Sequence, residues 1–147
     1  MGTEEIRIAL VILQDTRGHI ALQLRSPIPT IVNPDHWGIF GGHIEPGESP
    51  ETAAIREIAE ELTIQLDAGK LSFVESFDLT PSKQYFVFHY SITNEFNEAE
   101  LMEGEDFDLF PPSEISSGSI RGKNVVSYHI EIIERFVAHR TSQVSSS

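Results

Sequence analysis

The chain contains no cysteine, which excludes disulfide bonds, a thiol nucleophile and thiolate ligands for zinc. Basic residues are also scarce: ten Lys and Arg stand against 23 Asp and Glu, so the formal net charge at pH 7 is −13. Such a chain lacks the basic surface that binds long nucleic acids or anionic membranes. No apolar run approaches the roughly 20 residues that span a bilayer, and no signal peptide is visible. We therefore expect a cytoplasmic protein that binds neither long nucleic acid nor membrane.

A small phosphorylated substrate remains compatible with this charge only if divalent cations mask the repulsion. The length of 147 residues and a hydrophobic content of 39% are typical of one globular domain, which we expect over residues 1–147. Residues 141–147 carry nothing that would pack against a core, and we expect them to form a disordered tail.

The pattern of apolar residues predicts alternating strands and helices. Strands are expected over residues 5–15, 19–25, 70–79, 84–93 and 106–110, and an irregular loop over the proline-rich residues 26–35. One helix should begin with Ser49 as N-cap and Pro50 at its first position and end near Leu62; another should cover roughly residues 124–139. This order indicates an α/β sandwich with a mixed central β-sheet and helices on its faces.

The first predicted helix carries three glutamates on one side. Glu57, Glu60 and Glu61 have the spacing i, i+3, i+4, and we expect them roughly opposite an apolar stripe. The stripe consists of Ile55, Ile58, Ala59 and Leu62. Taken alone, three such glutamates more often form a solvated helix face than a metal site.

The segment before this helix changes that balance. Residues 37–48 contain paired glycines, which let the backbone approach a ligand closely. This segment directly precedes the N-terminus of the predicted helix, whose amide groups attract anions. Carboxylates together with a backbone carbonyl form an all-oxygen ligand set that suits Mg²⁺ or Mn²⁺. A phosphate-binding P-loop is excluded, because Glu48 stands where that motif requires a lysine.

Residues 42–64 resemble the Nudix box, which reads Gly, five residues, Glu, seven residues, then Arg-Glu-aliphatic-any-Glu-Glu-any-Gly-aliphatic. The matching positions are Gly42, Glu48, Arg56, Glu57, Ile58, Glu60, Glu61 and Ile64. The flanks, Leu22–Arg25 and Glu103–Glu105, also resemble this family of hydrolases. Thr63 departs from the box, because a β-branched residue strongly disfavours the left-handed conformation of the usual glycine. We therefore expect the helix to continue or to exit differently there.

The resemblance implies a Nudix-like α/β/α sandwich and a role for each matching residue. It implies that Glu57, Glu60 and Glu61, with the Gly41 carbonyl, bind Mg²⁺ or Mn²⁺, that Glu48 and Arg56 orient these ligands, and that Arg25 and Gly42 contact the substrate. The base that accepts a proton from the attacking water would be Glu57, Glu60 or Glu103, with Glu105 as a further candidate. For Glu103 and Glu105, a place in a solvated loop is an equally good interpretation, and for Arg25 so is a surface salt bridge.

The function implied is metal-dependent hydrolysis of a diphosphate linkage in a nucleoside diphosphate linked to another moiety, or in a nucleoside triphosphate. The alternative is a non-catalytic module on the same fold that binds a nucleotide as a sensor or partner. A homodimer would also be in keeping with the resemblance. Trp37 and Phe40 are expected to pack rather than to line a pocket, and His43 is the histidine nearest the glycines.

Overall fold

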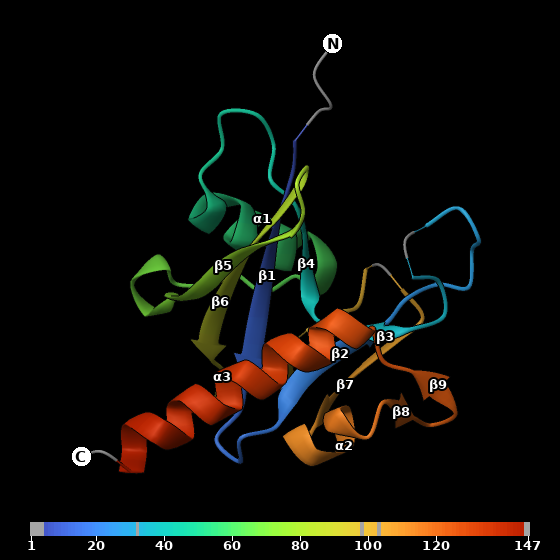
Figure 1. Ribbon diagram of the computed structural model, residues 1–147, viewed down its shortest axis with the longest axis vertical. Helices are drawn as coiled ribbons and strands as arrows, with labels where there is room; N and C mark the ends of the chain where they lie inside the picture. Colours follow the sequence, from blue (N-terminus) through green and yellow to red (C-terminus); the bar gives the residue numbers. More distant parts are fainter. Residues whose placement is uncertain (1–4, 32, 98, 103, 146–147) are drawn as a thin grey trace.

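A mixed seven-stranded β-sheet lies between two helices in the computed structural model, which describes residues 5–31, 33–97, 99–102 and 104–145, with side chains up to residue 140 (Figure 1). The strands of the sheet are β1 (Ile6–Gln14), β2 (Ile20–Leu24), β3 (Trp37–Gly38), β4 (Phe40–His43), β5 (Ser72–Thr80), β6 (Lys83–Ser91) and β7 (Asp106–Phe110). The helices are α1 (Pro50–Leu62), α2 (Pro112–Ser116) and α3 (Ser127–Ser145). The 3₁₀ turns η1 (Ala68–Lys70) and η2 (Glu95–Asn97) and the short pair β8 (Ser119–Ile120) and β9 (Lys123–Asn124) complete the described elements.

Strand β1 is the centre of the sheet, because it pairs in parallel with β6 and antiparallel with β4. Its side chains alternate between two cores. Ala9, Val11 and Leu13 pack with α1, whereas Leu10 and Ile12 pack with α3. A strand covered on both faces must be apolar in both registers, as the sequence shows. The expected α/β/α sandwich is confirmed, with α3 crossing the near face of the sheet and α1 behind it (Figure 1).

Helix α1 begins and ends where the sequence predicts. The Ser49 hydroxyl accepts a hydrogen bond from the Thr52 amide at 3.1 Å, and Pro50 occupies the first position. At the other end, Thr63 adopts φ 58° and ψ 25°, the left-handed conformation that we expected it to avoid. Its amide still donates to the Ala59 carbonyl, and its hydroxyl accepts from the Glu100 amide at 3.2 Å. The helix therefore ends as it would with glycine, and the expectation of a different exit is wrong.

The buried face of α1 is rotated from the predicted stripe. Ile58 and Leu62 are buried as expected, but Ile55 and Ala59 are only half-buried. Glu61 is buried instead, with 2% of its surface exposed. The three glutamates consequently do not share one solvated face, because Glu61 points into the protein.

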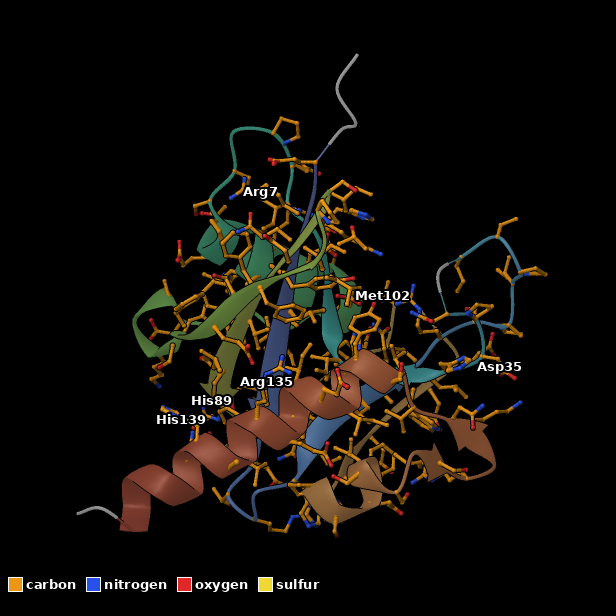
Figure 2. All side chains as sticks on the ribbon, viewed as in Figure 1. Arg7, Asp35, His89, Met102, Arg135 and His139 are labelled. Carbon is orange, nitrogen blue, oxygen red and sulfur yellow. The ribbon has the colours of Figure 1, made fainter. Side chains whose placement is uncertain are left out.

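Helix α3 lies against the sheet through Ile132, Ile133 and Phe136. The His89 ring of β6 stacks on Phe136 of α3 with centroids 4.9 Å apart, and Figure 2 shows His89 beside this helix. The helix begins at Ser127, three residues later than predicted, and it continues to Ser145. Residues 141–145 are thus helical rather than a disordered tail, whereas residues 146 and 147 lie outside the described part.

Two strands occur where the sequence indicates only a loop. Strands β3 and β4 form within the glycine-rich segment before α1, and β4 pairs with β1 from Ile8 to Val11. Strands β5, β6 and β7 confirm the remaining predictions to within two residues, and the expected loop over 26–35 contains no strand or helix in its described residues. In the described part of the chain, no helix is long and apolar enough to cross a membrane.

Candidate active site

The paired glycines place the backbone of β4 directly against α1. A side chain at Gly42 would overlap the carboxyl group of Glu57. Gly41 has φ 151°, a conformation that favours glycine, and a side chain there would overlap the Ala9 carbonyl of β1. Both glycines are therefore required by close approach: Gly41 for sheet pairing, and Gly42 for the position of Glu57.

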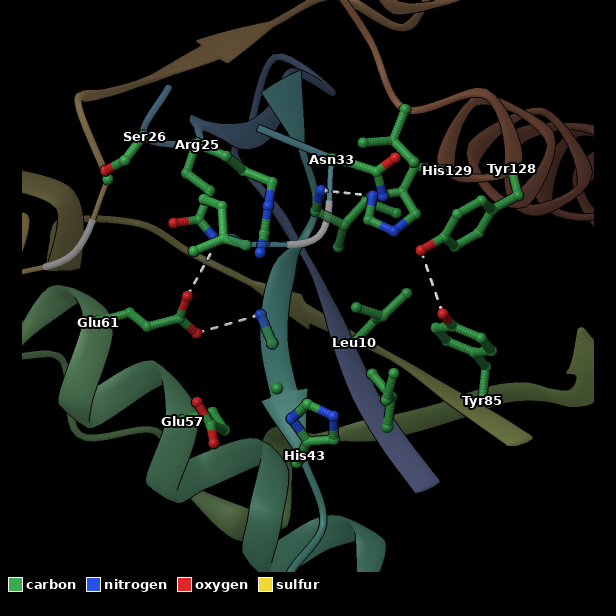
Figure 3. Close-up of a pocket in the computed structure, with 18 of the residues that line it drawn as sticks. Leu10, Arg25, Ser26, Asn33, His43, Glu57, Glu61, Tyr85, Tyr128 and His129 are labelled. Carbon is green, nitrogen blue, oxygen red and sulfur yellow. Dashed lines mark hydrogen bonds between the residues drawn. The ribbon is translucent and has the colours of Figure 1, made fainter. Parts of the chain in front are cut away.

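The buried Glu61 carboxylate accepts a hydrogen bond at each of its oxygens. Its Oε1 accepts from the Gly41 amide at 3.1 Å, and its Oε2 accepts from Gln23 Nε2 at 2.9 Å (Figure 3). Gln23 is itself 4% exposed. A buried carboxylate needs such partners, because it has lost its hydration. Sequence reasoning did not identify Gln23, although a polar residue at position 4 of the apolar strand β2 was an available signal.

Arg56 connects the remaining carboxylates. Its Nε and Nη2 donate to the two oxygens of Glu48 at 2.7 and 2.9 Å, a bidentate pair, and Nη2 also donates to the His43 carbonyl at 3.0 Å. Its Nη1 donates to Glu57 at 3.0 Å and to Glu60 at 3.3 Å. The hydrogen bonds from Arg56 lower the pKa of Glu48 to about 2, and those to Glu48 raise the pKa of Arg56. Glu48 and Arg56 thus form a charged brace that fixes the other two glutamates.

The donor set at this place fits a hard divalent cation. Glu57, Glu60 and Glu61 supply carboxylate oxygens, and the missing side chain of Gly42 leaves the Glu57 carboxylate beside the β4 backbone. No preassembled cluster of three His, Cys, Asp or Glu side chains that could hold a metal ion occurs among residues 5–31, 33–97, 99–102 and 104–140. Arg56 holds both Glu57 and Glu60 in this structure, so a bound cation would share these carboxylates with the arginine.

All three glutamates line a pocket of about 520 Å³. Glu57 and Glu61 lie at one end of it (Figure 3). This volume lies in the range of sites for small molecules. The pocket is lined by Gly41, Gly42 and His43 of β4, by Gln23, Arg25, Ser26 and Gly104, and by residues of β1, β6 and the start of α3. The Arg25 side chain extends into the pocket near Glu61, as Figure 3 shows.

The other side of the pocket carries aromatic residues that sequence reasoning missed. Tyr85 of β6 donates a hydrogen bond from its hydroxyl to that of Tyr128, at 3.1 Å. His129 of α3 accepts a hydrogen bond at Nδ1 from the Ile39 amide, at 3.0 Å. Burial, together with the charge of Arg25, lowers the pKa of His129 to about 3. No motif marks these residues, because only the folded sheet brings β6 and α3 together.

The structure describes three of the other residues that the sequence singled out. Trp37 and Phe40 are buried and pack in the two cores. Glu105 is exposed, and its amide donates to the Leu24 carbonyl. Glu103, the distal candidate for the base, lies outside the described residues.

Comparisons with known proteins identify the family. The model of the NUDIX domain matches residues 5–136. The chain therefore belongs to the Nudix domain family, as the box in residues 42–64 predicts. Solved structures share the fold, among them a mutT/nudix family protein from Listeria innocua (TM-score 0.76, 21% identity, covering 99% of this chain and 100% of that one) and the MutT protein from Methanosarcina mazei Go1 (TM-score 0.73, 21% identity, 95% and 98%).

Curated relatives match over shorter segments. The dihydroneopterin triphosphate diphosphatase of Escherichia coli K12 is 34% identical over 68 residues, which are 46% of this chain and 41% of that protein. The human diphosphoinositol polyphosphate phosphohydrolase 3-alpha is 35% identical over 60 residues, 41% of this chain and 37% of that protein. The asymmetrical bis(5'-nucleosyl)-tetraphosphatase of Sus scrofa is 50% identical over 42 residues, 29% and 27%. The matches thus span less than half of each relative.

Proposed function

We propose that this chain is a divalent-metal-dependent hydrolase that cleaves a diphosphate linkage, in a nucleoside diphosphate linked to another moiety or in a nucleoside triphosphate. The observation that carries the proposal is the placement of Glu57, Glu60 and Glu61 at one end of a pocket of about 520 Å³. The names of the relatives support it, because each describes a diphosphatase, a phosphohydrolase or a tetraphosphatase.

The position of each residue suggests its role in metal binding. Glu57, Glu60, Glu61 and the Gly41 carbonyl would hold Mg²⁺ or Mn²⁺, which when bound neutralises phosphate charge and activates water. Glu48 fixes Arg56, so that the glutamates are held in place before the substrate arrives.

Substrate binding would involve further residues of the pocket, and proton transfer would involve one of the carboxylates. Arg25 and the Gly42 backbone line the pocket, where they can bind phosphate oxygens of the substrate. Glu57 or Glu60 would accept the proton of the attacking water, and Glu103 stays a candidate for the same step.

Activity with and without Mg²⁺ tests the proposal. We expect release of phosphate, pyrophosphate or a nucleoside monophosphate from a panel of nucleotides in the presence of Mg²⁺ or Mn²⁺, with products identified by mass spectrometry. Glu57→Gln should lower kcat by at least about 100-fold, because charge stabilisation by such groups contributes several kcal/mol. Glu51→Gln removes the same charge from an exposed position of the same helix and should match the wild type.

A folded protein that binds nucleotides but turns none over with either cation would refute the enzyme and favour the non-catalytic binding module. The expected homodimer and cytoplasmic location stay predictions, which sedimentation and cell fractionation would test.

A further inference from the structure

The side of the pocket opposite α1 has walls that differ from the glutamate end. Leu10, Ile39 and Val126 are buried aliphatic residues that line it, with 4%, 2% and 2% of their surface exposed. Tyr128 and His129 stand beside them at the start of α3. An apolar wall with few polar atoms disfavours a ligand part that is covered with hydroxyl groups, because those groups would lose their hydration.

The His129 ring presents a fixed hydrogen-bond donor to this part of the pocket. Its Nδ1 accepts from the Ile39 amide, so the proton of the neutral ring must be on Nε2. The residue is 5% exposed, and its other ring nitrogen faces the pocket in Figure 3. The absent side chain of Gly38 lets the ring sit this close to β3, since a Cβ there would lie 3.1 Å from Nδ1. Burial lowers the pKa of His129 to about 3, so the ring stays neutral and the donor persists near pH 7.

Tyr128 supplies a second donor. Because Tyr85 donates its hydroxyl proton to the Tyr128 oxygen, the Tyr128 proton can point elsewhere. Tyr85 is itself held by a stacked contact with Phe77, whose ring centroid is 5.2 Å away, and by an edge contact with Tyr128 at 5.5 Å. The Tyr128 ring meets His129 edge-on at 4.6 Å. The two donors therefore stand on a rigid aromatic cluster.

We propose that Tyr128 and His129, with the aliphatic wall behind them, form a subsite that binds the flat heteroaromatic ring of the substrate through acceptor atoms on its edge. The inference rests on the proposed function and narrows it. A nucleobase or a pteridine offers a flat apolar face together with carbonyl oxygens or unprotonated ring nitrogens, whereas a diphosphoinositol polyphosphate offers a non-planar ring covered with phosphate and hydroxyl groups. Of the three kinds of substrate that the relatives' names describe, the nucleotide and the pterin fit this subsite and the inositol does not.

The test compares substrates with and without a ring. The four nucleoside triphosphates and dihydroneopterin triphosphate carry one, whereas tripolyphosphate carries none and a diphosphoinositol polyphosphate carries only hydroxyl and phosphate groups. His129→Asn keeps an oxygen that can accept from Ile39 but loses the donor on the pocket side. It should raise KM for the best ring-bearing substrate by between about three- and tenfold, the value of one hydrogen bond, and leave kcat within about twofold.

Further variants separate recognition from structure. Tyr128→Phe keeps the ring and removes only the hydroxyl, so it should act in the same direction with less effect on folding. Neither variant should change the kinetics of tripolyphosphate. His139→Asn makes the same substitution at an exposed position of α3 and should match the wild type.

Calorimetric titration of the same compounds gives Kd without turnover. A protein that binds ring-bearing triphosphates with a Kd sensitive to His129 but hydrolyses nothing would contradict the proposed function and keep the subsite. Unchanged KM and Kd in both variants, or tighter binding of the diphosphoinositol compound than of every ring-bearing one, would overturn the subsite while leaving hydrolysis intact.

Discussion

Replacing Gly42 with alanine should separate activity from stability. The added methyl group would overlap the Glu57 carboxyl group, which is the far end of a flexible side chain. The carboxylate therefore has to move, whereas the backbone of β4 and the helix do not. We expect Gly42→Ala to fold normally and to hydrolyse poorly.

The expected magnitudes follow from these contacts. Loss of glycine flexibility in the unfolded chain should stabilise the variant by roughly 0.4–1 kcal/mol. A displaced rotamer of Glu57 costs about 0.5–1.5 kcal/mol, and a weakened ion pair with Arg56 at most about 1 kcal/mol. The free energy of unfolding should therefore stay within about 2 kcal/mol of the wild type. A carboxylate misplaced by about 1 Å can lower kcat by about 100-fold, or about 2.7 kcal/mol of transition-state stabilisation.

Urea unfolding and Mg²⁺-dependent product release measure the two effects on the same sample. Gly69→Ala is the control, because Gly69 is an exposed residue of η1 outside the box, and the nearest atom to an added Cβ would be Asp67 Oδ1 at 3.4 Å. That variant should keep full activity. If Gly42→Ala hydrolysed within twofold of the wild type, Glu57 would not need its observed position and the assigned role would be wrong.

Three further predictions concern the C-terminal end of α1 and the buried polar groups. Thr63→Gly should have a free energy of unfolding about 1 kcal/mol above that of Thr63→Ala, because both lose the hydroxyl and only alanine keeps the strained Cβ; equal values would disprove the strain. Gln23→Leu should lower the free energy of unfolding by about 1–3 kcal/mol, since Glu61 would lose a buried partner, and an unchanged urea midpoint would contradict this. Burial lowers the pKa values of His129 and His89 to about 3 and 4, below the ordinary 6.5, so the unfolded chain binds more protons below pH 6.5. Stability should therefore fall as the pH drops from 6.5 towards 4, by up to about 1.4 kcal/mol per pH unit for His129. In a series of urea unfolding curves at different pH, His129→Asn should reduce this fall. A wild-type protein whose stability did not change over this pH range would contradict the prediction.

The glutamate end of the pocket was predictable from the sequence, because its residues are near neighbours on one loop and one helix. Spacing alone placed Glu57, Glu60 and Glu61 on α1, and the pairing of Arg56 with Glu48 follows from two positions eight residues apart. The burial of Glu61 was not predictable in this way. It depends on Gln23, which reaches the helix from a strand 38 residues earlier.

The opposite side of the pocket could not be predicted from the sequence, for a different reason. Tyr85, Tyr128 and His129 come from β6 and α3, and each is an ordinary residue of its own strand or helix. Their meeting depends on which strand lies beside β1, and the sequence carries no local mark of that parallel pairing. The left-handed Thr63 shows the converse limit, since the rest of the fold overrides a local conformational preference.

The parallel pairing of β1 with β6 also constrains how the chain can fold. Every residue pair in this ladder, from Ile6 with Lys83 to Gln14 with Ser91, is separated by 77 positions. During synthesis, β1 emerges with both faces apolar, and the edge that pairs with β6 stays unpaired until the chain has been synthesised up to β6. Long-range pairing of this kind slows folding and leaves an apolar strand open to other chains. The same strand that unites both cores of the native protein is thus the segment most exposed to misassociation before folding is complete.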